Sequence, residues 1–578
     1  MRGSILGNLT VAVLLSSGCY GGLTAEDNAA SGGTDGVDDG DGGDGNDDGD
    51  DDGDDEAEGG VDEGSNPEEL PAPNTRFYRL THAQWENTVR DLLQLTDVTG
   101  FSVEFRPDAE ESGYIYANNA QATEVDSALW AGYQRAATST ATLAIVTDPS
   151  IMDTIVTTPG DPEAFIRDFG RRAFRRSLTD AEVAVYMGAW SDAPSYYTDS
   201  VGFEAGVRLT LESMLQSPMF LYRIEASEGE AGGVIPLSDY EVASRLSYFL
   251  WDSMPDDELL DAAAADMLGE YEGVAEQAAR MLDNPKAANA VEQFHYALHN
   301  VKHFESAAPN AAIYPDAPAD LGLLAQEEHS RFVQDVIFEQ NGSYIDLLTS
   351  NETFVNAETA ALYGLDASNY GPEFEKATLD ASQRRGIFTQ LGFLVSNATG
   401  VQPDPIHRGV FMVKRIACGQ IPAPPDNVPD LPAAEGQTNR EAIVALTEQP
   451  GSDCSGCHST VINPWGFPFE NYDSTGAWRD LDNGFTVDPA TNVVLGGVEV
   501  PVANALELID VMVTSDEVHN CYADNWVQFA NGRPRAAEDG PLIQRLAGLS
   551  KEDNSVKDVL IELVTSRPFR ARSTQEVD

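Results

Sequence analysis

Two cysteines and a histidine lie close together in the C-terminal part of the chain, in the order Cys454-Ser-Gly-Cys457-His458. Two thiols three positions apart can form thioether bonds with the two vinyl groups of a haem, and the histidine that follows becomes an axial ligand of the iron. The pattern therefore predicts one covalent haem c, anchored by Cys454 and Cys457 and ligated by His458.

Three other interpretations of the two thiols stay open from the residues alone. Cys454 and Cys457 can form a short disulfide with each other. They can also join Cys418 and Cys521 in a zinc site with four thiolate ligands, the geometry that structural zinc prefers. Finally, the motif can be a degenerate haem site that is never loaded.

The sixth ligand of such a haem is not fixed by the sequence. Downstream of His458 the candidates are Met512 and His519, and His407 is a candidate upstream. A methionine ligand raises the reduction potential, whereas a second histidine lowers it. An open sixth position, the remaining alternative, favours peroxide or oxygen chemistry over simple electron transfer.

The residues after the motif have the types that a haem pocket needs. The carbonyl group of Pro464 can orient His458 through the second ring nitrogen, as partners of metal-ligating histidines do. Core packing is an equally good interpretation of the aromatic side chains nearby. These are Trp465, Phe467, Phe469 and Tyr472.

A second group of histidines lies further upstream. His295, His299 and His303 recur every four residues, so they lie along one side of a helix, and the Glu-Glu-His sequence at 327–329 can complete a metal site for a hydrolase. No HExxH pattern is present, and three histidines along a straight helix cannot reach one ion. The favoured interpretation is an ordinary amphipathic helix.

The N-terminus has the features of an export signal. Arg2 is followed by a short apolar run and by Ser16-Ser17-Gly18-Cys19, which predicts a signal peptide over 1–18. A cysteine at this place is typical of a bacterial lipoprotein, in which Cys19 carries the lipid. The alternative is an ordinary signal peptide with an incidental cysteine. We expect a protein of the cell envelope that contacts the membrane only through this lipid, since no other segment is apolar enough to span it.

The charge of the chain is strongly negative, at −62. Residues 26–69 contain 20 Asp or Glu and no Lys or Arg. Such a segment has nothing apolar to bury and repels itself, so residues 19–73 should be a disordered tether. Nucleic acid is excluded as a partner, because phosphate binding needs clustered basic side chains.

Export also bears on the remaining cysteines. If Cys19 is lipidated and the CxxCH motif holds haem, only Cys418 and Cys521 are left. In an oxidising compartment two leftover cysteines predict one disulfide. It would close a loop around the haem motif.

Helix signals dominate the rest of the chain. Capping boxes begin at Thr81, Thr179 and Ser238, and helical spacing continues over 272–282, 325–339 and 383–395. Residues 493–502 are the clearest strand, and 421–432 form a Pro-rich strap. The expected fold is mainly α and multi-domain. Its parts are a helical N-terminal domain (74–225), a helical middle domain (226–370), a CxxCH-bearing cytochrome-like segment (371–490) and a C-terminal helical segment that completes a cytochrome-c-like domain (491–578).

Five consecutive stretches resemble a known assembly. They are residues 77–93 (FYRLTHAQWENTVRDLL), 169–179 with 216–223 (FGRRAFRRSLT, QSPMFLYR), 237–256 (LSDYEVASRLSYFLWDSMPD), 385–473 (RGIFTQ, HRGV, CSGCH, NPWGFPFENYD) and 521–533 (CYADNWVQFANGR). Together they are similar to the tandem cassette of domains of unknown function in planctomycete-type cytochrome-like proteins. The resemblance implies a mostly helical, exported, cytochrome-like protein, and it implies no reaction. The family pattern usually has Asp where this chain has Asn463.

These features together predict an exported c-type cytochrome-like lipoprotein. It would transfer electrons outside the cytoplasm to a redox partner that the sequence does not identify, or oxidise or reduce an unknown substrate. The alternative from another class is a non-redox binding scaffold at the cell surface, with cysteines that form only structural disulfides.

Overall fold

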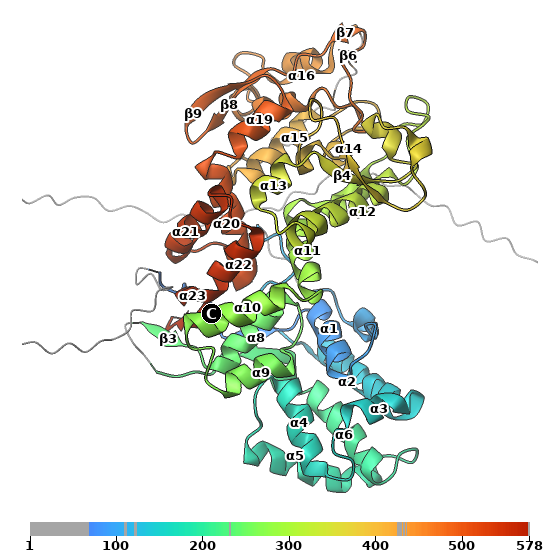
Figure 1. Ribbon diagram of the computed structural model, residues 1–578, viewed down its shortest axis with the longest axis vertical. Coiled ribbons are helices and arrows are strands. Elements are labelled where there is room, and N and C mark those ends of the chain that lie inside the picture. The colour runs from blue at the N-terminus through green and yellow to red at the C-terminus, as the bar shows by residue number, and fades with distance from the viewer. Residues whose placement is uncertain are drawn as a thin grey trace, which may run out of the picture. The chain divides into compact units, whose positions relative to one another are not determined.

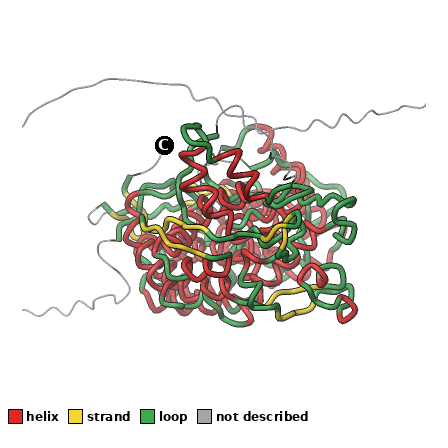
Figure 2. Tube along the Cα trace, turned by 90° about the horizontal axis from the view of Figure 1, so that it is seen from above, coloured by secondary structure: helices red, strands yellow, loops and turns green. Residues whose placement is uncertain are grey.

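The structure is a computed structural model that describes residues 69–108, 113–120, 124–229, 233–424, 431, 434 and 436–575. The predicted signal peptide, Cys19 and most of the predicted tether lie outside these ranges, as does much of the Pro-rich strap. Helices form most of the described chain and the strands are short and paired, so the prediction of a mainly α protein is confirmed (Figures 1 and 2). No helix in these ranges is long and apolar enough to cross a membrane.

A pair of short strands closes the first set of helices. β1 (Phe77–Arg79) pairs antiparallel with β2 (Tyr222–Ile224). The helices between them bury their apolar faces in one core, in which Trp85 and Phe165 are enclosed. These helices are α1 (His82–Leu92), α2 (Ser127–Thr142), α3 (Pro149–Ile155), α4 (Pro162–Phe174), α5 (Asp180–Asp192), α6 (Phe203–Leu215) and α7 (Pro218–Leu221).

A second strand pair brackets the rest of the chain, since β3 (Val234–Pro236) pairs with β10 (Ala571–Ser573). The helices between them run from α8 (Asp239–Leu250), α9 (Asp257–Ala264), α10 (Tyr271–Leu282), α11 (Lys286–Leu298), α12 (Leu321–Gln334) and α13 (Tyr344–Thr349) through α14 (Leu391–Ser396), α15 (Pro405–Phe411), α16 (Asn439–Thr447), α17 (Ser455–Cys457) and α18 (Asn463–Gly466) to α19 (Ala505–Met512), α20 (Asp516–Asn531), α21 (Gly540–Lys551), α22 (Val556–Thr565) and α23 (Arg567–Arg570). Antiparallel strand pairs accompany them: β4 (Glu352–Val355) with β5 (Glu375–Thr378), β6 (Leu481–Asp482) with β7 (Phe485–Thr486), and β8 (Thr491–Leu495) with β9 (Val498–Val502).

The largest hydrophobic core is shared along this second part. The rings of Phe294 in α11 and Trp526 in α20 stack with centroids 3.4 Å apart. Apolar residues from the expected segments 226–370, 371–490 and 491–578 belong to the same core. The CxxCH segment is therefore held by helices from both sides of it in the sequence (Figure 1).

The three capping boxes begin helices where the sequence predicted them. Thr81, Thr179 and Ser238 precede α1, α5 and α8, and each exchanges hydrogen bonds with the Gln or Glu three positions later. These contacts satisfy backbone N–H groups that have no partner within a helix, which fixes the first residue of each helix.

Two predicted elements differ from the structure. The helix expected over 383–395 is reduced to α14, because Gly386 has a φ of +57° and a Cβ there would lie 2.0 Å from the carbonyl oxygen of Leu348. The strand expected over 493–502 is a hairpin, since the chain reverses at Gly496-Gly497 between β8 and β9. In both places the glycines interrupt an otherwise regular pattern of apolar residues.

Candidate haem-attachment site

The CxxCH motif folds as one helical turn. Cys454 directly precedes α17, and the backbone N–H of His458 donates to the carbonyl oxygen of Cys454 at 3.0 Å. Residues three positions apart in such a turn share a face, so the two cysteines lie on the same side. Both thiols are half-buried and free, and no disulfide joins Cys454 to Cys457.

A π-helical turn follows the motif and sets the direction of His458. Residues His458–Ile462 form this turn, whose hydrogen bonds join residues five apart, and α18 continues it. The wide turn brings Asn463 beside His458, and His458 Nδ1 hydrogen-bonds Asn463 Oδ1 at 3.1 Å. The sequence predicted the carbonyl of Pro464 in this role. The structure gives it to the side chain of Asn463 instead.

The orientation of the Asn463 amide is fixed by its other partners. Asn463 is fully buried, and its Nδ2 donates to Glu448 Oε1 at 2.7 Å and to Thr447 Oγ1 at 2.9 Å. An ionised carboxylate only accepts hydrogen bonds, and the Thr447 hydroxyl already donates its proton to the carbonyl of Ile443. Oδ1 must therefore face His458. It follows that His458 Nδ1 carries a proton, which leaves Nε2 as the ring nitrogen that can bind a metal.

Two candidates for the sixth ligand are engaged elsewhere. His519 is fully buried, with Nδ1 2.8 Å from Ser550 Oγ and Nε2 3.0 Å from the carbonyl oxygen of Val513. Both of its ring nitrogens therefore have partners. Met512 is fully buried in the large hydrophobic core. Either residue would have to leave a packed position to bind iron.

The third candidate, His407, lies on α15. This helix packs closely on the turn after the motif, since a Cβ at Gly409 would lie 2.0 Å from the carbonyl oxygen of Ile462 and one at Gly466 would lie 1.8 Å from that of Pro405. His407 is two residues from both Pro405 and Gly409, so it is on the opposite side of α15. Its side chain is 70% exposed, and its contact with Asp404 at 2.6 Å raises its pKa.

The aromatic residues after the motif belong to the hydrophobic packing of this segment. The Phe469 ring packs on Phe393 with centroids 5.0 Å apart, and Tyr472 packs edge-on against Trp478 at 5.4 Å. These contacts are those of residues packed in a hydrophobic core. All four are buried: Trp465, Phe467, Phe469 and Tyr472.

The other two cysteines are joined to each other. Cys418 and Cys521 form a disulfide that links the segment after α15 to α20 across 103 residues of sequence, and the CxxCH motif lies within that loop. Their thiols are therefore not available for the alternative zinc site. No group of three or more His, Cys, Asp or Glu side chains in the described ranges is arranged to hold a metal ion.

The histidine stripe is likewise not a metal site in the part of the chain that is described. His295 is fully buried, and its ring contacts the carbonyl oxygen of Val291 at 2.9 Å and the Tyr522 hydroxyl at 3.1 Å. His299 contacts His329 at 2.9 Å, whereas His303 is near the surface beside Ser306. The three side chains thus have three separate environments.

These observations define a mainly helical protein that presents two free thiols and an oriented histidine on one turn. Comparison with family models places five matches in tandem, each described as a protein of unknown function. They are DUF1587 over 78–146, DUF1595 over 162–225, DUF1592 over 237–365, DUF1588 (the model named PSCyt3) over 384–482 and DUF1585 over 500–569. The chain contains, in tandem, the five domains that make up the cassette of planctomycete-type cytochrome-like proteins. No curated protein and no solved structure matches it.

Proposed function

We propose that the protein is an exported, lipid-anchored, c-type cytochrome-like protein that transfers electrons outside the cytoplasm. One haem would be held by Cys454 and Cys457 and ligated by His458. The observation that carries this proposal is the orientation of His458, whose Nδ1 is held by Asn463 while two free thiols lie on the same turn. The family cassette supports a haem-related role but specifies no reaction.

The donor set fits a c-type haem. Two free thiols on one face of a helical turn can reach two vinyl groups, and a histidine whose Nδ1 is hydrogen-bonded can bind iron through Nε2. Both thiols are half-buried rather than enclosed in the core. When bound, the haem would supply one-electron oxidation and reduction at its iron.

The protein's own residues have distinct tasks in this proposal. Cys454 and Cys457 bind the group, and His458 ligates it. Asn463 holds the proton on Nδ1 of His458, and Glu448 holds the Asn463 amide in that direction. The lipid on Cys19 would keep the protein at the membrane, and the tether would let it reach a redox partner.

The test is a pyridine haemochrome spectrum of the purified protein. The chain would be expressed with its own signal sequence in a host that has the cytochrome c maturation machinery. A c-type spectrum that disappears in Cys457→Ser is the expected result. A folded, exported protein without haem would contradict the proposal and favour the non-redox surface scaffold. Mass spectrometry of the 454–458 peptide would check the covalent bond.

A further inference from the structure

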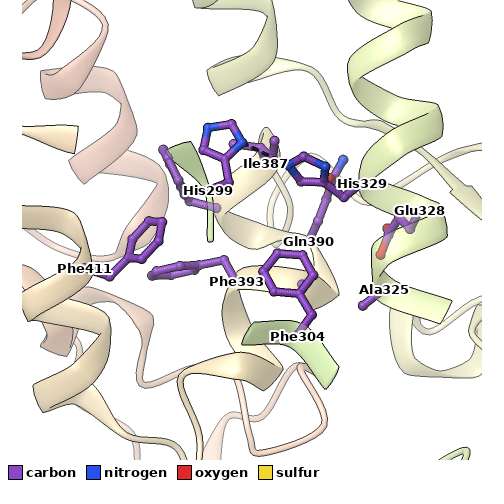
Figure 3. Close-up of a pocket in the computed structure, with 11 residues that line it drawn as sticks. His299, Phe304, Ala325, Glu328, His329, Ile387, Gln390, Phe393 and Phe411 are labelled. Carbon is purple, nitrogen blue, oxygen red and sulfur yellow. Dashed lines mark hydrogen bonds between the residues drawn. The ribbon is translucent and has the colours of Figure 1, made fainter. Parts of the chain in front are cut away.

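A small cavity lies between α11, α12 and α14, outside the CxxCH turn (Figure 3). Its volume is about 10 Å³. His299, Glu328 and His329 line one side, and the rings of Phe304 and Phe393 lie on the other. The cavity is at a seam between two families of the cassette, since these polar residues lie within 237–365 and the residues from 387 onward lie within 384–482.

Three residues that line the cavity have buried polar atoms that lack a hydrogen-bond partner in the described part of the chain. These atoms are His299 Nε2, Glu328 Oε2 and both side-chain polar atoms of Gln390. The three residues are 4%, 1% and 3% exposed, respectively. Buried polar groups are nearly always hydrogen-bonded, either to protein or to ordered water. The wall of the cavity is mostly apolar, but a space of about 10 Å³ beside unpaired polar atoms has room for one water molecule.

Glu328 has unusual surroundings for a carboxyl group. Its Oε1 accepts hydrogen bonds from the hydroxyl groups of Thr353, at 2.5 Å, and of Tyr363. No Lys or Arg forms an ion pair with it among the described residues. The nearby Arg384 lies over the ring of Tyr363 at 4.7 Å and donates to backbone carbonyls. Burial raises the pKa of Glu328 to about 7.

The neighbouring imidazoles cannot balance a negative charge on Glu328. Burial lowers the pKa of His329 to about 3 and holds that of His299 well below its ordinary value. Both rings are therefore neutral near pH 7, and they hydrogen-bond each other at 2.9 Å. His329 lies between His299 and Glu328 in the wall of the cavity (Figure 3).

We propose that this cavity is a buried proton-binding site, in which Glu328 holds the proton and one water molecule joins its Oε2 to the Gln390 amide. The water accepts from Gln390 Nε2. When Glu328 is protonated, its O–H donates to the water. When Glu328 is ionised, the water donates to Oε2, and the released proton has passed to solvent. The site uses none of the residues of the proposed haem site, so its test does not depend on that function.

Infrared spectroscopy of the purified full-length protein tests the titration. The C=O stretch of a buried, protonated carboxyl group should disappear as the pH rises through about 7 and should be missing in Glu328→Gln. Glu327→Gln is the matched control, because Glu327 is the preceding residue on α12, is 48% exposed and pairs with Arg331. The control should keep the band. A band that titrates at about pH 4, as an ordinary Glu does, would overturn the proposal.

Two further measurements test the water and the hydrogen bonds. Magnetic relaxation dispersion of water nuclei should count one fewer long-lived water in Gln390→Leu than in the wild type, and an unchanged count would contradict the proposal. Thr353→Val removes a hydroxyl group that donates to Glu328 and stabilises its ionised form. The infrared band of Glu328 should therefore titrate at a higher pH in this variant. This variant keeps the test available if Glu328→Gln does not fold. Stoichiometric transition metal that is lost in His299→Ala would overturn the proton site in favour of a metal site.

Discussion

His458 Nδ1 donates a hydrogen bond to Oδ1 of Asn463, five residues later, at 3.1 Å. This contact exists because a π-helical turn, rather than an α-helical one, connects the two residues. π-turns are rare and often occur at functional sites. Here the turn makes a neutral amide the partner of the proposed iron ligand, and Glu448 and Thr447 keep that amide from rotating.

Replacing Asn463 should change the proton position on His458. In Asn463→Leu nothing holds the proton on Nδ1, so NMR of the haem-free protein should show both tautomers of His458, where the wild type shows one. In the haem-loaded protein the iron–histidine bond should weaken, because loss of such a partner typically costs roughly 10–100-fold in metal affinity. A single tautomer in the variant would refute the orienting role.

The charge at position 463 should set the reduction potential. Asn463→Asp alone would put two carboxyl groups in contact, because the Asn463 amide lies 2.7 Å from Glu448 Oε1, so the change is made together with Glu448→Gln and compared with Glu448→Gln alone. The double variant places a carboxylate against Nδ1, which makes the imidazole a stronger electron donor and favours the oxidised iron. The midpoint potential should therefore fall, and each tenfold change in relative stability corresponds to about 59 mV. Asn471→Asp is a suitable control, because Asn471 is buried in the same segment and donates to the carbonyl of Arg479, not to His458. Equal shifts in both variants would mean that the effect is not specific to His458.

The packing of α15 on α18 predicts opposite effects at two glycines. Gly409→Ala should destabilise the protein by about 1–3 kcal/mol, because its methyl group would collide with the Ile462 carbonyl and displace the turn that holds His458. Gly456, inside the CxxCH motif, has no atom within 4 Å of the same position. Gly456→Ala should leave stability unchanged or raise it by about 0.4–1 kcal/mol. Urea unfolding monitored by circular dichroism would measure both, and similar losses in the two variants would contradict the packing argument.

Local signals in the sequence found the helices that begin with capping boxes and the CxxCH turn itself. These depend on residues within four positions of each other, so spacing alone reveals them. The partners of Asn463 were missed, because Thr447 and Glu448 lie about fifteen residues earlier and only the folded chain brings them to the amide. The cavity around Glu328 was missed for the same reason, since α11, α12 and α14 meet through tertiary packing.

The disulfide between Cys418 and Cys521 should stabilise the fold around the CxxCH segment. It closes a loop of 103 residues, and a cross-link of this span restricts the unfolded chain by about 4–5 kcal/mol in the chain-entropy model. The double variant Cys418→Ala, Cys521→Ala should therefore lose roughly 2–5 kcal/mol of unfolding free energy. Urea unfolding of both proteins would measure it. A loss below about 1 kcal/mol would show that the bond constrains little of the unfolded chain.

Glu328 should make stability depend on pH in a defined window. Its pKa rises from the ordinary value of 4.5 to about 7 on folding, so the folded protein binds the proton more tightly than the unfolded chain does. The stabilisation that Glu328 gives to the folded state is fully present below pH 4.5 and is lost as the pH rises to about 7. A pKa shift of this size corresponds to about 3 kcal/mol of unfolding free energy. His299 and His329 act in the opposite sense, because their lowered pKa values favour the folded state at higher pH. Urea unfolding of Glu328→Gln and Glu327→Gln should therefore be measured from pH 4.5 to 7.5, and the difference between their free energies of unfolding should be compared at each pH. If the two variants lose stability in parallel across this range, Glu328 does not take up a proton on folding.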